Sequence, residues 1–400
     1  MGRASMIMVM SYSTVLMMMG FNISKVSNSA YENYIDYYER TVAHNIVNSG
    51  ANLAAQQIYV QPNWRTGYSN KPMFGGTINA AVTTQSDSTL KLFVTAEYKT
   101  YRDTVIVVLQ PSSFSKFSYY SNIEGNIWWT SKDTVWGPMH TQDYLGVANS
   151  PVFYGKVTSK KGLEIHSGGA NPKFYGDFQS GVSLELPSDL NPLKSASASG
   201  GRYIYDNDVS IEFMDDSAKV KIGTSADTMV YLPTWAPNGA ILVEKGNLRL
   251  KGTVNKSLTV GALEGGSSSK GKVYFDDDLK YKYDPLLYPD STVVVGVVAE
   301  DSLVITQNSA NQEDIIIQAA LFSLTKGLGS ENYNIGDPRG KIELLGGITQ
   351  YQRAAVGTFS GESITHGYSK RYRYDERLMV IRPPFFPTTG SYEVLSWYER

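Results

Sequence analysis

Residues 4–24 read ASMIMVMSYSTVLMMMGFNIS, a run of 21 residues without a charged side chain. At about 1.5 Å of rise per residue, an α-helix of this length reaches about 30 Å, the thickness of the hydrocarbon core of a bilayer. Four hydroxyl residues at 11–14 make the middle more polar than a usual span, but such hydroxyls bond back to the helix backbone. The run therefore predicts a membrane helix, and Arg3 on its short flank favours an N-terminus on the inner side.

A cleaved secretory signal is the alternative interpretation of this run. The run is long for the apolar core of a signal, and no small-x-small cleavage site precedes a mature start. Instead, apolar residues continue at spacings of three or four as far as Leu53, with no proline before Pro62. We expect one helix over residues 1–60, embedded in lipid first and amphipathic afterwards. The residues expected to serve the membrane or assembly faces are Ile7, Val15, Leu16, Phe21, Ile35, Tyr38, Val42, Ile46 and Leu53.

Residues 61–112 predict an antiparallel β-meander. After a loop rich in Pro, Gly and Asn at 61–75, apolar and polar residues alternate over 78–82, 90–96 and 105–109, with a turn at 85–88. A period of two over adjacent runs indicates strands with one buried face. The amphipathic half of the helix is expected to cover that face. The residues expected to pack on the sheet are Tyr38, Val42, Ile46 and Leu53.

Residues 113–400 predict a parallel β-helix or solenoid-like domain. Residues 152–157 (VFYGKV) and 173–178 (KFYGDF) match at an offset of 21, a repeat length typical of stacked coils. A large antiparallel sandwich stays open as an alternative, although few Asn-Gly or Asp-Gly hairpin turns occur. The expected fold class is thus mainly β with one long N-terminal helix. At the C-terminal end, three prolines at 383–387 end the stack, and Phe385, Phe386 and Trp397 are expected to cover it.

Composition argues against several functions. The net charge is only −2, so no long-range field attracts nucleic acid, and the basic and aromatic stretch 368–374 is followed by Asp375 and Glu376. The chain has no cysteine, which excludes disulfides and thiolate metal sites. No HExxH, Gly-x-Ser-x-Gly or phosphate-loop pattern occurs. We therefore expect a protein that is not an enzyme, has no cofactor and does not bind nucleic acid.

The densest acidic cluster is Asp276-Asp277-Asp278, which has the oxygen ligands that Ca²⁺ prefers. A solvated turn after a strand is the plainer interpretation. Trp128, Trp129 and Trp136 lie among short strands, where exposed rings stack on sugars and buried rings belong to the core. Two other functions stay open: a polysaccharide-active β-helix enzyme using the acidic cluster, and a tip component of a secretion machine.

The N-terminal layout resembles that of type IV pilins and pseudopilins. Prepilins are cut after a Gly just before the apolar run, and Gly2 stands at that position, with Arg3 following it. Ile7 occupies the place where pilins usually carry an acidic residue. Further segments resemble an uncharacterised bacterial family of pilin-like envelope proteins, built on the plan of PilX-type minor pilins. These segments are residues 137–141, 151–158, 318–332, 340–359 and 367–397.

The resemblance implies an exported, membrane-tethered, β-rich protein without assigned chemistry. Its expected location is the bacterial envelope, either anchored in the inner membrane with an exported ectodomain or within an extracellular filament. The partners that it implies are the membrane and other pilin-like subunits or copies of the same chain, reached through the N-terminal helix. A surface polysaccharide is a further expected partner of the structural or adhesive ectodomain.

Overall fold

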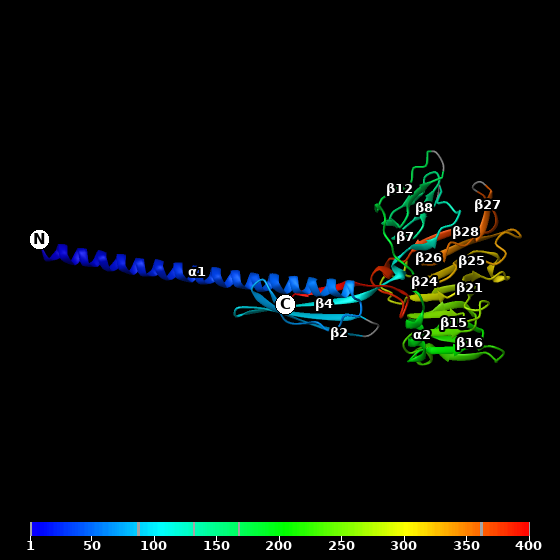
Figure 1. Cartoon of the computed structure of the whole chain (residues 1–400), viewed down its shortest axis with the longest axis horizontal. Coiled ribbons are helices and arrows are strands. Elements are labelled where there is room, and N and C mark those ends of the chain that lie inside the picture. The colour runs from blue at the N-terminus through cyan, green and yellow to red at the C-terminus, as the bar shows by residue number, and fades with distance from the viewer. Residues whose placement is uncertain (1, 86–88, 131–132, 167–168, 361–362, 400) are drawn as a thin grey trace. The chain divides into compact units, whose positions relative to one another are not determined.

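The computed structural model describes residues 2–85, 89–130, 133–166, 169–360 and 363–399, and it divides into two compact units (Figure 1). The first unit holds residues 1–111 and 391–400, and the second holds residues 112–390. The predicted mainly β fold with one long N-terminal helix is confirmed. The predicted boundaries need one correction, because the last ten residues join the first unit instead of the solenoid.

The first unit combines one helix with a five-stranded sheet whose order is β1-β2-β3-β4-β29. Its elements are α1 (Arg3–Val60), β1 (Tyr68–Met73), β2 (Gly76–Thr84), β3 (Leu90–Tyr98), β4 (Tyr101–Ser113) and β29 (Thr388–Glu399). Strands β1 to β4 pair antiparallel in chain order, as the alternating pattern predicted. The predicted turn at 85–88 falls mostly outside the described residues. Figure 1 shows α1 as one continuous helix with β2 and β4 beside its second half.

The second half of α1 packs on the sheet through a stripe of mostly small residues. Its buried residues are Glu39, Ala43, Ile46, Val47, Gly50, Ala51, Ala54 and Ile58. Small side chains let the helix approach closely: a Cβ added to Gly50 would lie 3.0 Å from Ile78 of β2. Val42 and Leu53 are only partly buried, and Tyr38 is 53% exposed. The prediction that Tyr38 packs on the sheet is therefore wrong, because the buried stripe follows Ala and Gly positions that the apolar pattern had not counted.

The C-terminal strand β29 completes this sheet at the edge of β4. Tyr392 and Trp397 pack against the core that α1 forms with the sheet. Gln110 Nε2 donates to Glu393 Oε1 at 2.9 Å, and Arg65 donates to Tyr392 Oη at 3.3 Å. The prediction that Trp397 covers the end of the solenoid is therefore wrong: it belongs to the helix-containing unit.

The second unit consists of two stacks of β-coils. The short stack, residues 119–180, has short strands: β5 (Tyr119–Ile123), β6 (Thr134–Val135), β7 (Met139–Thr141), β8 (Tyr144–Val147), β9 (Val152–Phe153), β10 (Val157–Ser159), β11 (Gly162–Ile165), β12 (Lys173–Phe174) and β13 (Phe178–Ser180). The two sequence repeats lie in register, because Phe153 pairs with Phe174 and Val157 with Phe178. The offset of 21 is therefore one full coil.

The long stack, residues 202–374, winds through longer coils. Its strands are β14 (Arg202–Tyr205), β15 (Val209–Asp215), β16 (Ser217–Ile222), β17 (Thr228–Tyr231), β18 (Ala240–Glu244), β19 (Leu248–Val254), β20 (Leu258–Leu263), β21 (Val273–Tyr281), β22 (Val295–Ala299), β23 (Leu303–Ile305), β24 (Ile315–Ser323), β25 (Leu328–Ser330), β26 (Pro338–Gln352), β27 (Gly357–Ser360) and β28 (Ser363–Tyr374). The short helices of the unit are η2 (Phe114–Lys116), α2 (Asn191–Ala198), α3 (Leu232–Trp235), η3 (Ala310–Gln312) and η4 (Glu376–Met379).

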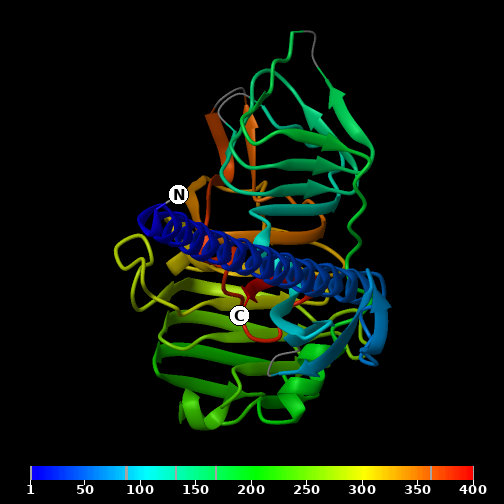
Figure 2. The ribbon, with the colours of Figure 1, turned by 90° about the vertical axis from the view of Figure 1, so that its left-hand side faces the viewer.

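One parallel sheet runs through both stacks in the order β13-β10-β7-β5-β26-β24-β22-β20-β18-β14. The chain enters this sheet in the middle, at β5, and builds the short stack first. It then continues at the far end with α2 and β14 and winds back until β26 pairs with β5. Figure 2 shows the strands of both stacks as successive rungs. Parallel pairing throughout the sheet argues against the antiparallel sandwich.

The inside of the long stack is a column of apolar, mostly aliphatic side chains, including Ile211, Leu250, Phe275, Ile317 and Leu344. The antiparallel strands β16 and β17 extend from β15 at the far end of the stack. A second core lies on the outer face of the sheet, where α2 and residues 378–386 cover Leu242, Val298 and Phe322. Phe386 packs there, with its ring 6.1 Å from that of Phe322. Phe385 and Phe386 thus cover a flank of the stack, and the prediction that they cover its end is wrong.

Candidate functional site

The first candidate site is the N-terminal half of α1, the one helix in the described part of the chain that is long and apolar enough to span a membrane. None of its most apolar 18-residue window is buried within the chain. Ile7, Val15, Leu16 and Phe21 are all exposed, whereas Ile35 is partly buried. This half of the helix therefore has no protein surface to cover it within the chain, and water is a poor solvent for it.

Two hydroxyl groups in this half bond back to the helix itself. Ser11 Oγ donates to the carbonyl oxygen of Ile7, and Thr14 Oγ1 donates to that of Met10, each at 2.8 Å. The polar middle of the run therefore presents fewer unpaired groups to lipid than its composition suggests. At the start, Gly2 caps the helix and Arg3 is its first residue, both exposed. Cleavage between them stays a prediction.

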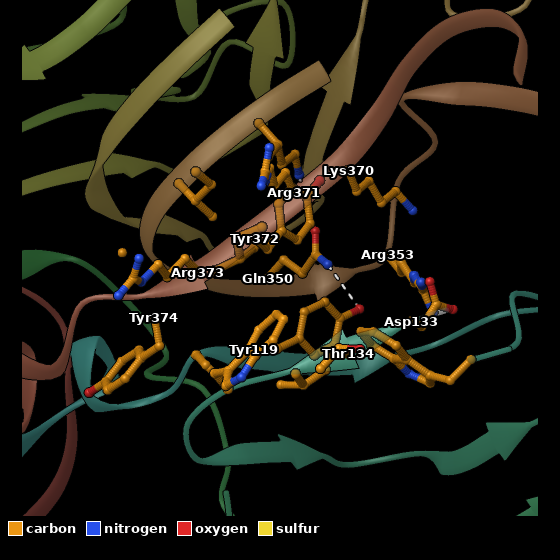
Figure 3. A pocket seen from close by; sticks show the side chains of 18 of the residues that line it. Tyr119, Asp133, Thr134, Gln350, Arg353, Lys370, Arg371, Tyr372, Arg373 and Tyr374 are labelled. Carbon is orange, nitrogen blue, oxygen red and sulfur yellow. Dashed lines mark hydrogen bonds between the residues drawn. The ribbon is translucent and has the colours of Figure 1, made fainter. Parts of the chain in front are cut away.

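The second candidate site is a cavity of about 250 Å³ between the two stacks of the second unit (Figure 3). It forms because only one strand of the last coil of the long stack pairs with the short stack. Residues 348–352 of β26 pair with β5, whereas residues 368–374 of β28 pair with β26 and with no strand of the short stack among the described residues. The cavity lies between this part of β28 and residues 118–136 of the short stack. Its aromatic and polar wall residues are Ser118, Tyr119, Trp129, Asp133, Thr134, Trp136, Gln350, Arg353, Lys370, Arg371, Tyr372, Arg373 and Tyr374.

The register of the strands explains how a lysine comes to line this cavity. Ile315 of β24 pairs with Ile342 of β26, which pairs with Lys370 of β28. Both isoleucines belong to the interior column of the long stack. Side chains in the same row of a parallel sheet share one face, so Lys370 stands in the row that lower coils fill with aliphatic groups. Figure 3 shows residues 370–374 on one side of the cavity, and Tyr119 and Thr134 on the other.

The position of Lys370 changes its acidity. Lys370 is an exposed residue that lines the cavity, and the protein around it still partly desolvates its ammonium group. That desolvation, together with repulsion from Arg353, lowers the pKa of Lys370 to about 8, against the smaller opposite effects of Asp133 and Glu124. No carboxylate of a described residue lies within ion-pair distance of Lys370. Within the described part of the chain, its ammonium group also has no hydrogen-bond acceptor.

Arg353 joins the two stacks at one end of the cavity. Its side chain is 7% exposed, and its Nη1 lies 3.2 Å from Oε2 of Glu124, which is 3% exposed. The guanidinium also stacks over the Trp129 ring, 4.4 Å from its centroid. Because a buried arginine must be paired, Glu124 neutralises most of its charge, and we assign this pair to holding the stacks together. Figure 3 shows Arg353 next to Asp133.

Hydrogen-bonding groups in the wall are only partly used. Gln350 Nε2 donates to Tyr119 Oη at 3.1 Å, and Asp133 Oδ2 accepts from the backbone N–H of Thr130 at 2.8 Å. The indole Nε1 of Trp129 is buried and has no protein partner in the described part of the chain. Leaving such a donor unpaired costs about 1–3 kcal/mol.

Three exposed aromatic rings lead away from the cavity along the short stack. Trp136 stacks on Tyr154 at 6.0 Å between centroids, and Tyr154 stacks on Tyr175 at 5.1 Å. The three side chains occupy successive coils and are 51%, 49% and 68% exposed. Trp136 also lines the cavity, so this aromatic ladder begins at the cavity wall.

The structure places the other predicted residues elsewhere. Asp276 lies 2.5 Å from Arg249, Asp278 lies 2.9 Å from Lys280, and Asp277 accepts from the backbone N–H of Asp278. All three lie in an irregularity of β21, where its pairing with β19 shifts register. Across the described residues, no group of three or more His, Asp or Glu side chains is arranged to hold a metal ion. The predicted Ca²⁺ site is therefore corrected to a bulge that local cations and backbone groups stabilise.

Comparisons with known proteins add little. No protein-family model and no curated protein matches the chain. Among solved structures, the crystal structure of the competence-associated pilin ComZ from Thermus thermophilus is similar over 90% of this chain and 97% of that chain, with 11% identity and a TM-score of 0.37. Because identity and TM-score are both low, this likeness carries no weight for function, which must come from the chain's own residues.

The sequence indicated parts of the cavity without placing them together. Trp129 and Trp136 were noted as core or sugar-stacking residues, and the stretch 368–374 was noted as basic and aromatic. Nothing in the sequence connected residues 119–136 with residues 350–374, because β5 and β26 are far apart in the chain.

Proposed function

We propose that this chain is a non-catalytic, pilin-like surface subunit that is anchored in the bacterial envelope by α1 and assembles with similar subunits through the same helix. The observation that carries the proposal is the sharp change along α1. Its second half is buried on a sheet, whereas its first half is apolar, exposed and long enough to cross a bilayer. One helix thus suits both a membrane and a helical filament core.

The finer assignment is to a filament of the type IV pilus class, with an adhesive rather than an enzymatic ectodomain. The cavity supports binding over catalysis, because Asp133 is the one carboxylate among its lining residues. Glycoside hydrolysis usually needs two carboxylates across the scissile bond. A tip component of a secretion machine remains the second candidate, and subunit copy number separates the two: a subunit as abundant as the filament is not a tip protein.

Anchoring is tested by placing charge inside the apolar run. The double variant Val15→Arg/Leu16→Arg costs about 2.5–3.5 kcal/mol for each arginine at the centre of a span. We expect it to leave the membrane fraction of fractionated cells. The control Tyr31→Arg/Tyr34→Arg, which lies beyond the run, should stay with the membrane. A wild-type chain found only in the cytosol would end the proposal.

Assembly is tested with single cysteines, since the chain has none of its own. Val26→Cys lies on the exposed part of α1, and Ala226→Cys lies on an exposed turn of the second unit. In a helical filament, mild oxidation should link Val26→Cys chains into dimers and leave Ala226→Cys chains monomeric. Equal cross-linking of both variants, or of neither, contradicts assembly through the helix.

A further inference from the structure

We propose that the cavity between the two stacks binds one uncharged, pyranose-sized sugar unit, free or at the end of a glycan. The proposal names a ligand class for the adhesive role suggested above and rests on that role only for its biological setting. All the residues involved lie within 112–390, so binding does not require α1 to be anchored or assembled.

Size is the first argument. The cavity holds about 250 Å³, which is below the roughly 300–1,000 Å³ of pockets that enclose drug-sized ligands. One sugar ring is of the right order, whereas a peptide segment or a nucleotide is larger. The ladder of Trp136, Tyr154 and Tyr175 gives the rest of a glycan a path outward, since it begins at the cavity wall.

The chemistry of the wall is the second argument. A pyranose ring has apolar C–H faces and a rim of hydroxyl groups that both donate and accept. The cavity offers aromatic rings from Trp129, Trp136 and Tyr372 for the faces. For the rim it offers the ammonium group of Lys370 as a donor and the carboxylate of Asp133 as an acceptor.

Charge is the third argument and favours a neutral ligand. The groups facing Lys370 are Arg353, Asp133 and Glu124. With Lys370 protonated, two cations face two carboxylates, and the local charge balances. Arg371 and Arg373 also border the cavity, but along β28 they alternate with Lys370 and Tyr372 and are exposed, and Arg371 Nη1 lies 3.6 Å from Glu343 Oε1. From the side chains that face Lys370, a carboxylated or phosphorylated ligand would therefore meet no excess positive charge.

The test is saturation-transfer NMR on the full-length chain in detergent micelles. The probes are D-glucose, D-galactose, D-mannose and N-acetyl-D-glucosamine, with D-glucuronate and sulfate as charged comparisons. At least one neutral sugar should bind with a Kd of the order of 1 mM, the range of few-contact recognition. Trp136→Ala and Lys370→Met should each weaken that binding about tenfold or more, and the matched Lys341→Met variant, at an exposed lysine outside the cavity lining, should leave it unchanged.

Both weakening variants change residues with accessible surface, and circular dichroism checks that they fold. Binding should also fall as the pH rises through about 8, where Lys370 loses its proton. The proposal is overturned if no neutral sugar binds, if only D-glucuronate or sulfate binds, or if binding survives both substitutions. None of these outcomes bears on anchoring or assembly, which fractionation and cross-linking test separately.

Discussion

Val47→Asp tests most directly how α1 holds the first unit together. Val47 has no accessible surface and packs in the core that α1 forms with β2, β3 and β4. Removing a buried valine forfeits about 1.5–3 kcal/mol of hydrophobic burial. An unpaired carboxylate in such a place costs a further 3–5 kcal/mol, roughly. Since whole domains are stable by only about 5–15 kcal/mol, we expect the first unit to be largely unfolded.

The matched control is Tyr38→Asp, nine residues earlier on the same helix. Tyr38 is 53% exposed, so the substitution should change stability by no more than about 0.5 kcal/mol. Both variants add the same charge to the same helix. Any difference between them therefore reports burial and not net charge or helix propensity.

Limited proteolysis with mass spectrometry, on the full-length chain in detergent, is the assay. Val47→Asp should produce new cuts within residues 61–110 and 391–399, while the parallel coils of 119–374 stay resistant. Tyr38→Asp should digest like the wild type. If Val47→Asp also digests like the wild type, the packing of α1 on the sheet is refuted. If Tyr38→Asp is cut as readily as Val47→Asp, the assigned buried face is wrong.

Three further predictions concern the second unit. Gly155→Ala should destabilise the short stack by about 1–3 kcal/mol or more, because the added Cβ would lie 1.9 Å from the carbonyl oxygen of Gly137. The control is Gly329→Ala, whose added Cβ would have its nearest contact at 3.6 Å and should be tolerated. Thermal unfolding of both variants checks this. Burial lowers the pKa of His140 to about 4, so the unfolded chain binds the extra proton between pH 6.5 and 4. Stability should fall by up to about 3 kcal/mol over that range in denaturant titrations, and His140→Phe should remove this dependence; an unchanged pH profile counts against it. Lys370→Met should raise the unfolding temperature at pH 7, because it removes a partly desolvated ammonium group. In the wild type, stability should rise between pH 8 and 10.5, where the unfolded chain keeps the lysine proton and the folded chain does not, and the variant should lose this rise. A lower unfolding temperature for the variant would contradict the prediction.

Local pattern alone determined the element types of this protein. The uncharged run at 4–24 predicted the membrane-length helix, and the absence of proline before Pro62 predicted its length. Alternation at 78–82, 90–96 and 105–109 predicted the three central strands of the sheet, and the 21-residue repeat predicted parallel coils. Each of these signals depends on residues that are close in sequence, because hydrogen bonds within a helix and the pleat of a strand are local.

The buried face of α1 was decided by the tertiary structure. Apolar periodicity pointed to Tyr38, yet the sheet approaches along Ala43, Gly50, Ala51 and Ala54. Close packing of a helix on a sheet favours small residues at the contact. A pattern of large apolar residues does not detect them, because Ala and Gly are only weakly hydrophobic. The placement of Trp397 failed for a related reason: strand β29 joins β4, a pairing across nearly 300 residues that no local pattern encodes.

The cavity, too, exists only through tertiary structure. Its two walls meet because β26 pairs with β5, so Ile348 lies opposite Tyr119 although 229 residues separate them. The sequence supplied a lysine and several aromatic residues, and each was compatible with a core, a surface or a site. Which of these holds depends on where the coils stop stacking, and that is fixed by the free energy of the whole packed unit and not by any segment of the chain.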